Sequence, residues 1–137
     1  MASLMNRSLA ILLCCSAGVA FAHHSFAMFD MNQDVTVRGT VVQFLWQSPH
    51  SWLDLTTREN GGRQDRWSLE MGAPSALYRH GWRQLSLKPG DQVTAVLHPL
   101  RDGRRGGSLV SVTLPDGTLL VGSGGSAAPA APAGKAP

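Results

Sequence analysis

The sequence is poor in cysteine and has no long hydrophobic run. Its two cysteines, Cys14 and Cys15, are adjacent and lie near the start of the 137-residue chain. No cysteine follows them, which excludes disulfide bonds, thiolate metal ligands and a cysteine nucleophile from the rest of the chain. A domain of about 100 residues can be stable without disulfides. The longest apolar run, residues 9–19, is well short of the roughly 20 residues that a membrane-spanning helix needs.

A strong excess of either charge is also missing. Twelve lysines and arginines face nine acidic residues, and the formal net charge is +3 at pH 7. This balance is too mild to give the basic surface that nucleic-acid-binding domains use. The sequence therefore predicts no nucleic-acid partner, and any argument from charge has to concern a local cluster.

Two motif fragments lack the residues that would make them functional. Residues 30–34 (DMNQD) begin like a calcium loop, but Val35 and Val41 stand where that loop has its glycine and its bidentate glutamate. Residues 122–126 (GSGGS) lack the strand–turn–helix setting of a nucleophile elbow.

Alternation places Glu70 on the solvent face of its expected strand rather than in the role of a general base. We identify no catalytic set, which favours a non-enzymatic protein.

The first 22 residues are typical of a secretory signal peptide. Arg7 supplies a basic start, residues 9–19 form the apolar centre, and Ala20-Phe21-Ala22 provides the small-x-small cleavage pattern. A twin-arginine pair is absent. We predict cleavage after Ala22, a periplasmic or secreted location, and no stable membrane span.

The C-terminal segment, residues 122–137, consists almost entirely of glycine, serine, alanine and proline. Such a composition buries too little apolar surface to offset the entropy lost on ordering. We therefore expect a disordered tail, with a tether or partner-binding segment as the alternative.

Between these ends, residues 23–121 show mainly the period-two alternation of β-strands and should form a single domain. An N-terminal arm is expected at 23–34. Strands are expected at 35–46, 51–57, 66–71, 92–98, 108–114 and 118–121, and a short helix at 74–80. Gly39 in the first strand indicates a bulge or sharp bend. Val35, Val37 and Val41 share one face of this strand and Val42, Phe44 and Trp46 share the other, which fits the same bend.

A bent first strand, three strands before a helix and two after it are typical of a small five-stranded Greek-key barrel of the OB type. We therefore predict an all-β fold of this OB-like kind. The alternative is a small β-sandwich, although the helix at 74–80 would interrupt its succession of strands.

The loops at 46–51 and 99–107 flank the binding face in such a barrel. The loops carry Arg101, Arg104, Arg105 and Trp46, and a second tryptophan, Trp52, directly follows the first loop. Arginine suits carboxylate or phosphate ligands, so this rim predicts binding of a small anionic ligand or of an envelope protein. The alternative is a solvated loop, with the tryptophans packed in the core or at the rim.

Four histidines could form a metal site. Cleavage after Ala22 would leave His23 with a free α-amine, which can chelate one metal together with its ring, and His24 adds a second imidazole. His50 or His98 would complete a nitrogen site for copper or another divalent transition metal. Because the rim should lie about 30–35 Å along the first strand, the arm would have to fold back along the barrel. The alternative is an exposed pair of histidines on a frayed end.

Three motifs support a resemblance to a known family. They are HHSF at 23–26, W-x-x-P-H-x-W at 46–52, and GW followed by LKPGD at 81–91. With these motifs, residues 23–121 resemble a family of small exported bacterial proteins known only as a domain of unknown function. The positions concerned are His23, His24, Ser25, Phe26, Pro49, His50, Trp82 and Gly90. Such proteins usually have Asn-Pro-His where this chain has Ser48-Pro49-His50, so the resemblance implies no role for a side-chain amide at position 48.

These observations leave three functions open. The first is an exported binding protein that holds a metal ion or a small anion at the rim. The second is an interaction or structural module of the envelope that uses the arginine and tryptophan rim. The third is an enzyme, which would need a metal-bound water because the chain supplies no nucleophile of its own.

Overall fold

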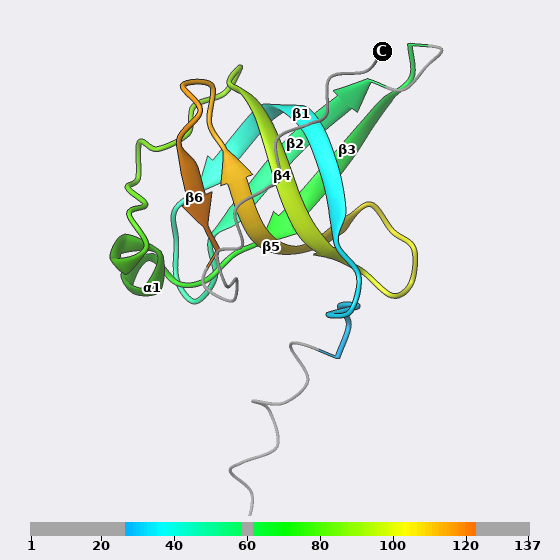
Figure 1. Ribbon diagram of the computed structural model, residues 1–137, viewed down its shortest axis with the longest axis horizontal. Coiled ribbons are helices and arrows are strands. Elements are labelled where there is room, and N and C mark those ends of the chain that lie inside the picture. The colour runs from blue at the N-terminus through cyan, green and yellow to red at the C-terminus, as the bar shows by residue number, and fades with distance from the viewer. Residues whose placement is uncertain (1–26, 59–61, 123–137) are drawn as a thin grey trace, which may run out of the picture.

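The computed structural model describes residues 27–58 and 62–122, which form six strands and one short helix (Figure 1). In chain order these are β1 (Val35–Leu45), β2 (Trp52–Arg58), β3 (Gln64–Glu70), α1 (Pro74–Arg79), β4 (Gln92–Pro99), β5 (Gly106–Thr113) and β6 (Leu119–Val121). The expected succession of elements is confirmed, and each end lies within two residues of its expected position. The expected signal peptide, His23, His24 and all but the first residue of the expected tail lie outside the described residues.

The sheet closes into a barrel. Its strands follow the order β3-β2-β1-β4-β5-β6, and an additional parallel pairing joins β3 to β5. This pairing closes a ring of five strands, with α1 between β3 and β4 in the chain and β6 added at the free edge of β5. The closed ring confirms the OB-like barrel and excludes the β-sandwich.

The barrel interior is filled by the alternate apolar residues of its strands. The fully buried members are Leu53, Leu55, Leu69, Ala95, Leu97 and Val112. Trp82, after α1, is also fully buried, and its indole Nε1 donates a hydrogen bond of 2.9 Å to the carbonyl of Val121 in β6. The segment after the helix and the last strand are thereby joined at one end of the barrel.

The first strand bends as expected, but its bulge lies three residues beyond Gly39. The register with β2 shifts between Val41 and Gln43, so Val42 is the extra residue and is 36% exposed. Because one inserted residue reverses the alternation, Phe44 packs against the same core as Val41. The change of parity in the sequence therefore marks this bulge. Gly39 has a different role, since a Cβ there would lie 2.8 Å from the Thr56 carbonyl oxygen.

The arm before β1 packs against the loop between β4 and β5 (Figure 1). Phe29 is 3% exposed and forms an antiparallel bridge with Leu100. The N–H of Asp30 donates to the Pro99 carbonyl at 2.8 Å, and the N–H of Arg101 donates to the Met28 carbonyl at 2.9 Å. We expected the arm to reach the rim only by folding back along the barrel. For the β4–β5 loop this expectation is wrong, because the arm contacts that loop directly. Since β1 and β4 are antiparallel, the end of β4 lies beside the start of β1.

Candidate functional site

Strand pairing places four residues of the rim in one row on the outer face of the barrel. Trp52 pairs with Glu70, Glu70 with Ser108, and Ser108 with His98. Directly paired residues point to the same face of a sheet, and the buried neighbours of these residues point inward. Glu70 and His98 are two strand spacings apart, or about 10 Å between Cα atoms.

His50 is held at the β2 side of this row. Its Nδ1 contacts the Glu70 carboxylate, whose side chain is 13% exposed, whereas the His50 side chain is 42% exposed. A carboxylate at Nδ1 favours the tautomer with its proton on that nitrogen, and Nε2 then keeps a free lone pair. The neighbouring Ser51 is fully buried and exchanges backbone hydrogen bonds with the segment that follows β3. The loop that carries His50 is therefore fixed to the end of β3.

His98 is held in the same way at the other side of the row. Its Nδ1 lies 3.1 Å from the Gln33 carbonyl oxygen and 3.2 Å from Asp34 Oδ1. Both neighbours are acceptors, so the Nδ1 proton points to the arm and Nε2 is the nitrogen left for a further ligand. The His98 side chain is 17% exposed.

The two histidines are not brought together around one point. His50 approaches Glu70 from the β2 side, whereas His98 lies on β4, beyond β5. In the described ranges 27–58 and 62–122, no three histidine, cysteine or acidic side chains are grouped so that they could hold a metal ion.

The three arginines of the β4–β5 loop each have a partner within the protein. Arg101 Nε donates to the Phe29 carbonyl at 3.0 Å, and Arg104 Nε donates to Asp102 Oδ2 at 2.7 Å. Arg105 lies 2.8 Å from Oδ2 of Asp65, a buried residue at the start of β3. These guanidinium groups hold the arm, the loop and the barrel interior in place.

The Asp102 carboxylate is also held by the backbone of this loop. The N–H of Arg104 donates to Asp102 Oδ1 at 3.0 Å. This hydrogen bond, followed by that from the Arg104 side chain, lowers the pKa of Asp102 below its ordinary value. The loop is thus organised around an ionised carboxylate on an exposed turn.

The two rim tryptophans lie on different sides of the barrel wall. Trp46 packs against the core, with its ring centroid 5.8 Å from that of Phe44. Trp52 is half-buried on the outer face beside Glu70. Only Trp52 is therefore placed in the row that contains His98.

The comparison with protein families shows which family the chain belongs to. The model of a family of unknown function, DUF6152, matches residues 10–109. The chain belongs to the DUF6152 family. The match confirms the family resemblance, although it starts within the expected signal peptide and ends in β5 rather than covering 23–121. The comparisons with curated proteins and with solved structures gave no match. Family membership supplies no ligand or reaction for DUF6152, so function has to be argued from the site.

Sequence reasoning missed both carboxylates that hold the histidines. Glu70 does lie on the outer face, but His50 covers it instead of solvent. The hairpin offered a signal, because its register opposes Trp52 to Glu70 and so brings the loop before β2 to the end of β3. Asp34 gave no comparable signal, since its contact with His98 depends on how β1 and β4 pair across the barrel.

Proposed function

We propose that this DUF6152 protein is an exported, non-enzymatic copper-binding protein. In this proposal residues 1–22 direct export and are removed, and the metal lies beside the loop between β4 and β5. Its ligands are the amine and imidazole of His23, the imidazole of His24, and Nε2 of His98. The observation that supports it is the docking of residues 28–30 on this loop, next to a histidine whose Nδ1 is already occupied.

The reach of the arm supports His98 rather than His50 as the barrel ligand. Met28 is four positions after His24, and an extended chain covers at most about 3.5 Å per position, or about 14 Å here. The Met28 carbonyl is bonded to the N–H of Arg101, which is three residues from His98. Three residues span at most about 10 Å. The extended lengths therefore allow His24 to reach His98 if residues 25–27 turn back, since the antiparallel bridge between Phe29 and Leu100 directs the chain before Met28 away from β4.

The contacts of His98 also suit a metal ligand. Metal-binding histidines usually donate their second ring N–H to a carboxylate or a backbone carbonyl, which fixes the tautomer and the ring orientation. The Gln33 carbonyl and the Asp34 carboxylate occupy these positions at 3.1 and 3.2 Å from Nδ1. The imidazole thus needs little reorganisation before it can bind a metal.

Two methionines favour copper over zinc or nickel. Met28 and Met31 are 45% and 41% exposed, although methionine is usually buried. Both belong to the docked arm, and thioethers are ligands that select Cu(I), whereas amine and imidazole nitrogens suit Cu(II). We therefore propose that the arm serves copper in both oxidation states.

The partners of the rim arginines make a small anion the weaker proposal at this place. An anion on Arg101 or Arg105 would compete with the arm carbonyl or with the buried Asp65. The histidines would need no such exchange, because their Nδ1 partners stay in place when Nε2 binds a metal.

The test is a competition titration with Cu(II) on the chain cleaved after Ala22. We expect one tight site, and we expect His98→Ala and a four-residue extension before His23 each to weaken binding by about tenfold or more, which is about 1.4 kcal/mol. His80→Ala is the matched control, because His80 is exposed at the end of α1 and should bind as the wild type does. Equal affinity in the wild type, His98→Ala and the extended chain would rule the proposal out.

A further inference from the structure

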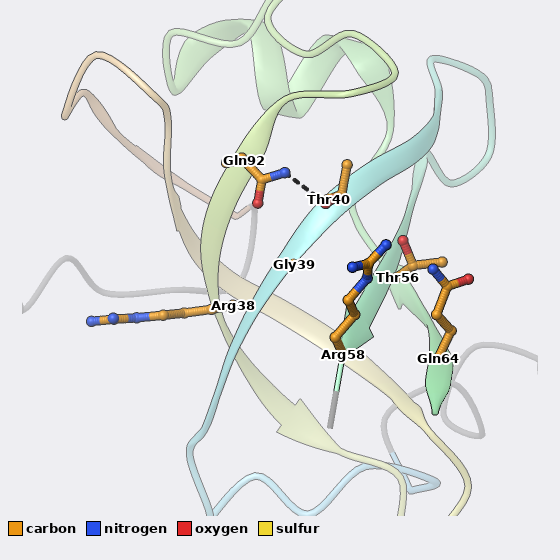
Figure 2. Close-up of a pocket in the computed structure, with 7 residues that line it drawn as sticks. All are labelled: Arg38, Gly39, Thr40, Thr56, Arg58, Gln64 and Gln92. Carbon is orange, nitrogen blue, oxygen red and sulfur yellow. Dashed lines mark hydrogen bonds between the residues drawn. The ribbon is translucent and has the colours of Figure 1, made fainter. Parts of the chain in front are cut away.

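A pocket on the outer face of the barrel points to a second ligand. It has a volume of about 580 Å³ and lies where β1, β2, β3 and β4 meet (Figure 2). Six polar side chains line it around the backbone of Gly39, namely Arg38, Thr40, Thr56, Arg58, Gln64 and Gln92. None of them belongs to the proposed copper site.

The pocket is produced by the change of partners along β1. Thr40 is paired with both Thr56 of β2 and Gln92 of β4, and before Thr40 the strand pairs with β4 alone. β2 continues past this point and pairs only with β3, through Arg58 and Gln64. β1 and β2 therefore diverge at Gly39, and the gap between them forms a fork. Because Gly39 has no Cβ, β1 can approach the Thr56 carbonyl at this fork.

Among the described residues, the lining carries two positive charges and no acidic group. Within the described part of the chain, the guanidinium groups of Arg38 and Arg58 make no hydrogen bond or ion pair, whereas that of Arg66 on the same face lies 2.8 Å from Asp54 Oδ2. Figure 2 shows the Arg58 side chain extending toward Thr56, with Gln64 beside it. Arg38 extends away from the other five side chains in the same view. Arg58 is therefore the direct contact for an anion, and Arg38 adds positive potential at the edge.

We infer that this pocket binds a small hydroxyl-bearing anion, such as a sugar acid or a sugar phosphate, through Arg58. The guanidinium fork matches a carboxylate or a phosphate. Threonine hydroxyls and glutamine amides can both donate to and accept from sugar hydroxyls, and Gln92 Nε2 is already positioned by a 2.7 Å bond to Thr40. The described residues that line the pocket include no aromatic side chain, which disfavours a stacked nucleobase. The volume is in the range of small-molecule sites.

The test is an NMR titration of the purified, metal-free protein with three probes. Glucose 6-phosphate and glucuronate carry the two oxyanions, and glucose is the neutral control. We expect saturable shifts at Thr40, Thr56, Gln64 and Gln92 with at least one of the two anions, and none with glucose. The anion that shifts them distinguishes phosphate from carboxylate recognition.

Variants separate a specific contact from net charge. Arg58→Gln should weaken binding of the active probe by about tenfold, because a charge-assisted hydrogen bond is lost. Arg79→Gln removes the same charge from the exposed end of α1, outside the pocket, and should change nothing. His98→Ala should also bind as the wild type does, so the outcome is independent of the copper proposal. Absence of saturable shifts with both anions, equal shifts with glucose, or equal weakening by Arg58→Gln and Arg79→Gln would overturn the inference.

Discussion

Arg104 and Arg105 are adjacent in one loop but contribute to the fold in different ways. The side chain of Arg104 is 71% exposed, and its partner Asp102 is on the surface. Arg105 is 38% exposed and lies 2.8 Å from Asp65, whose side chain is 9% exposed. A surface ion pair adds little to stability, whereas removing one partner of a buried carboxylate leaves a desolvated charge.

This contrast gives the first prediction. Arg105→Ala should lower the free energy of unfolding by about 2 kcal/mol, less than the full cost of an isolated buried charge because Arg63 still contacts Asp65. Arg104→Ala is the matched control and should leave the urea midpoint almost unchanged. Similar midpoints for the two variants would show that Asp65 does not need Arg105.

A second prediction concerns the pKa of Asp102. The N–H and the side chain of Arg104 both lower this pKa, with the backbone bond as the larger cause. Arg104→Ala keeps the backbone donor, so the pKa should rise only part of the way to its ordinary value in a carbon-detected NMR titration. Since the folded pKa is lowered, its contribution to stability is present above the ordinary aspartate range and is lost as the pH falls through the folded value. A full return to the ordinary value would contradict the role of the backbone.

Among the structural elements, the arm matters most for the proposed function. Phe29 is its only residue among the buried hydrophobic side chains of the described chain. Its neighbours carry the backbone bonds to the β4–β5 loop. The segment is therefore anchored at one side chain, and the copper ligands that we propose for it depend on that anchor.

Phe29→Ala should release the arm without unfolding the barrel. Loss of a buried phenylalanine costs about 3–5 kcal/mol where the site cannot collapse, enough to undock a short segment. Amide exchange at Asp30 and Arg101 should become faster, and Cu(II) binding should weaken by about tenfold because the ligands are no longer preorganised. Tyr78→Ala, an exposed aromatic truncation on α1, should leave both unchanged. Protected amides at Asp30 and Arg101 in Phe29→Ala would refute the anchor.

The strands and the helix were predictable because they follow local patterns. Alternation in β2, β4 and β5 and the proline at the start of α1 are visible in the sequence. The position of the bulge at Val42 was harder to predict, because a glycine inside a strand, here Gly39, is the more obvious sign of a bulge. That glycine is needed for close approach to β2, which becomes visible only when β1 and β2 are paired.

At the scale of the whole molecule, the contacts of the site depend on which strands close the barrel. Sequence reasoning selected His50, His98 and the rim arginines as candidates. Their partners Glu70, Asp34 and Asp65 follow from pairings between distant segments, which local patterns do not encode. The pocket at Arg58 has the same origin, since it lies where β1 leaves β2 for β4.

The most direct test of the central claim combines intact-mass and metal analysis on one sample of the exported protein. The proposal predicts a chain that begins at His23 and carries about one copper ion after growth with copper. His98→Ala should begin at the same residue and carry much less. A wild-type chain that begins at His23 and holds no more copper than His98→Ala would contradict the account.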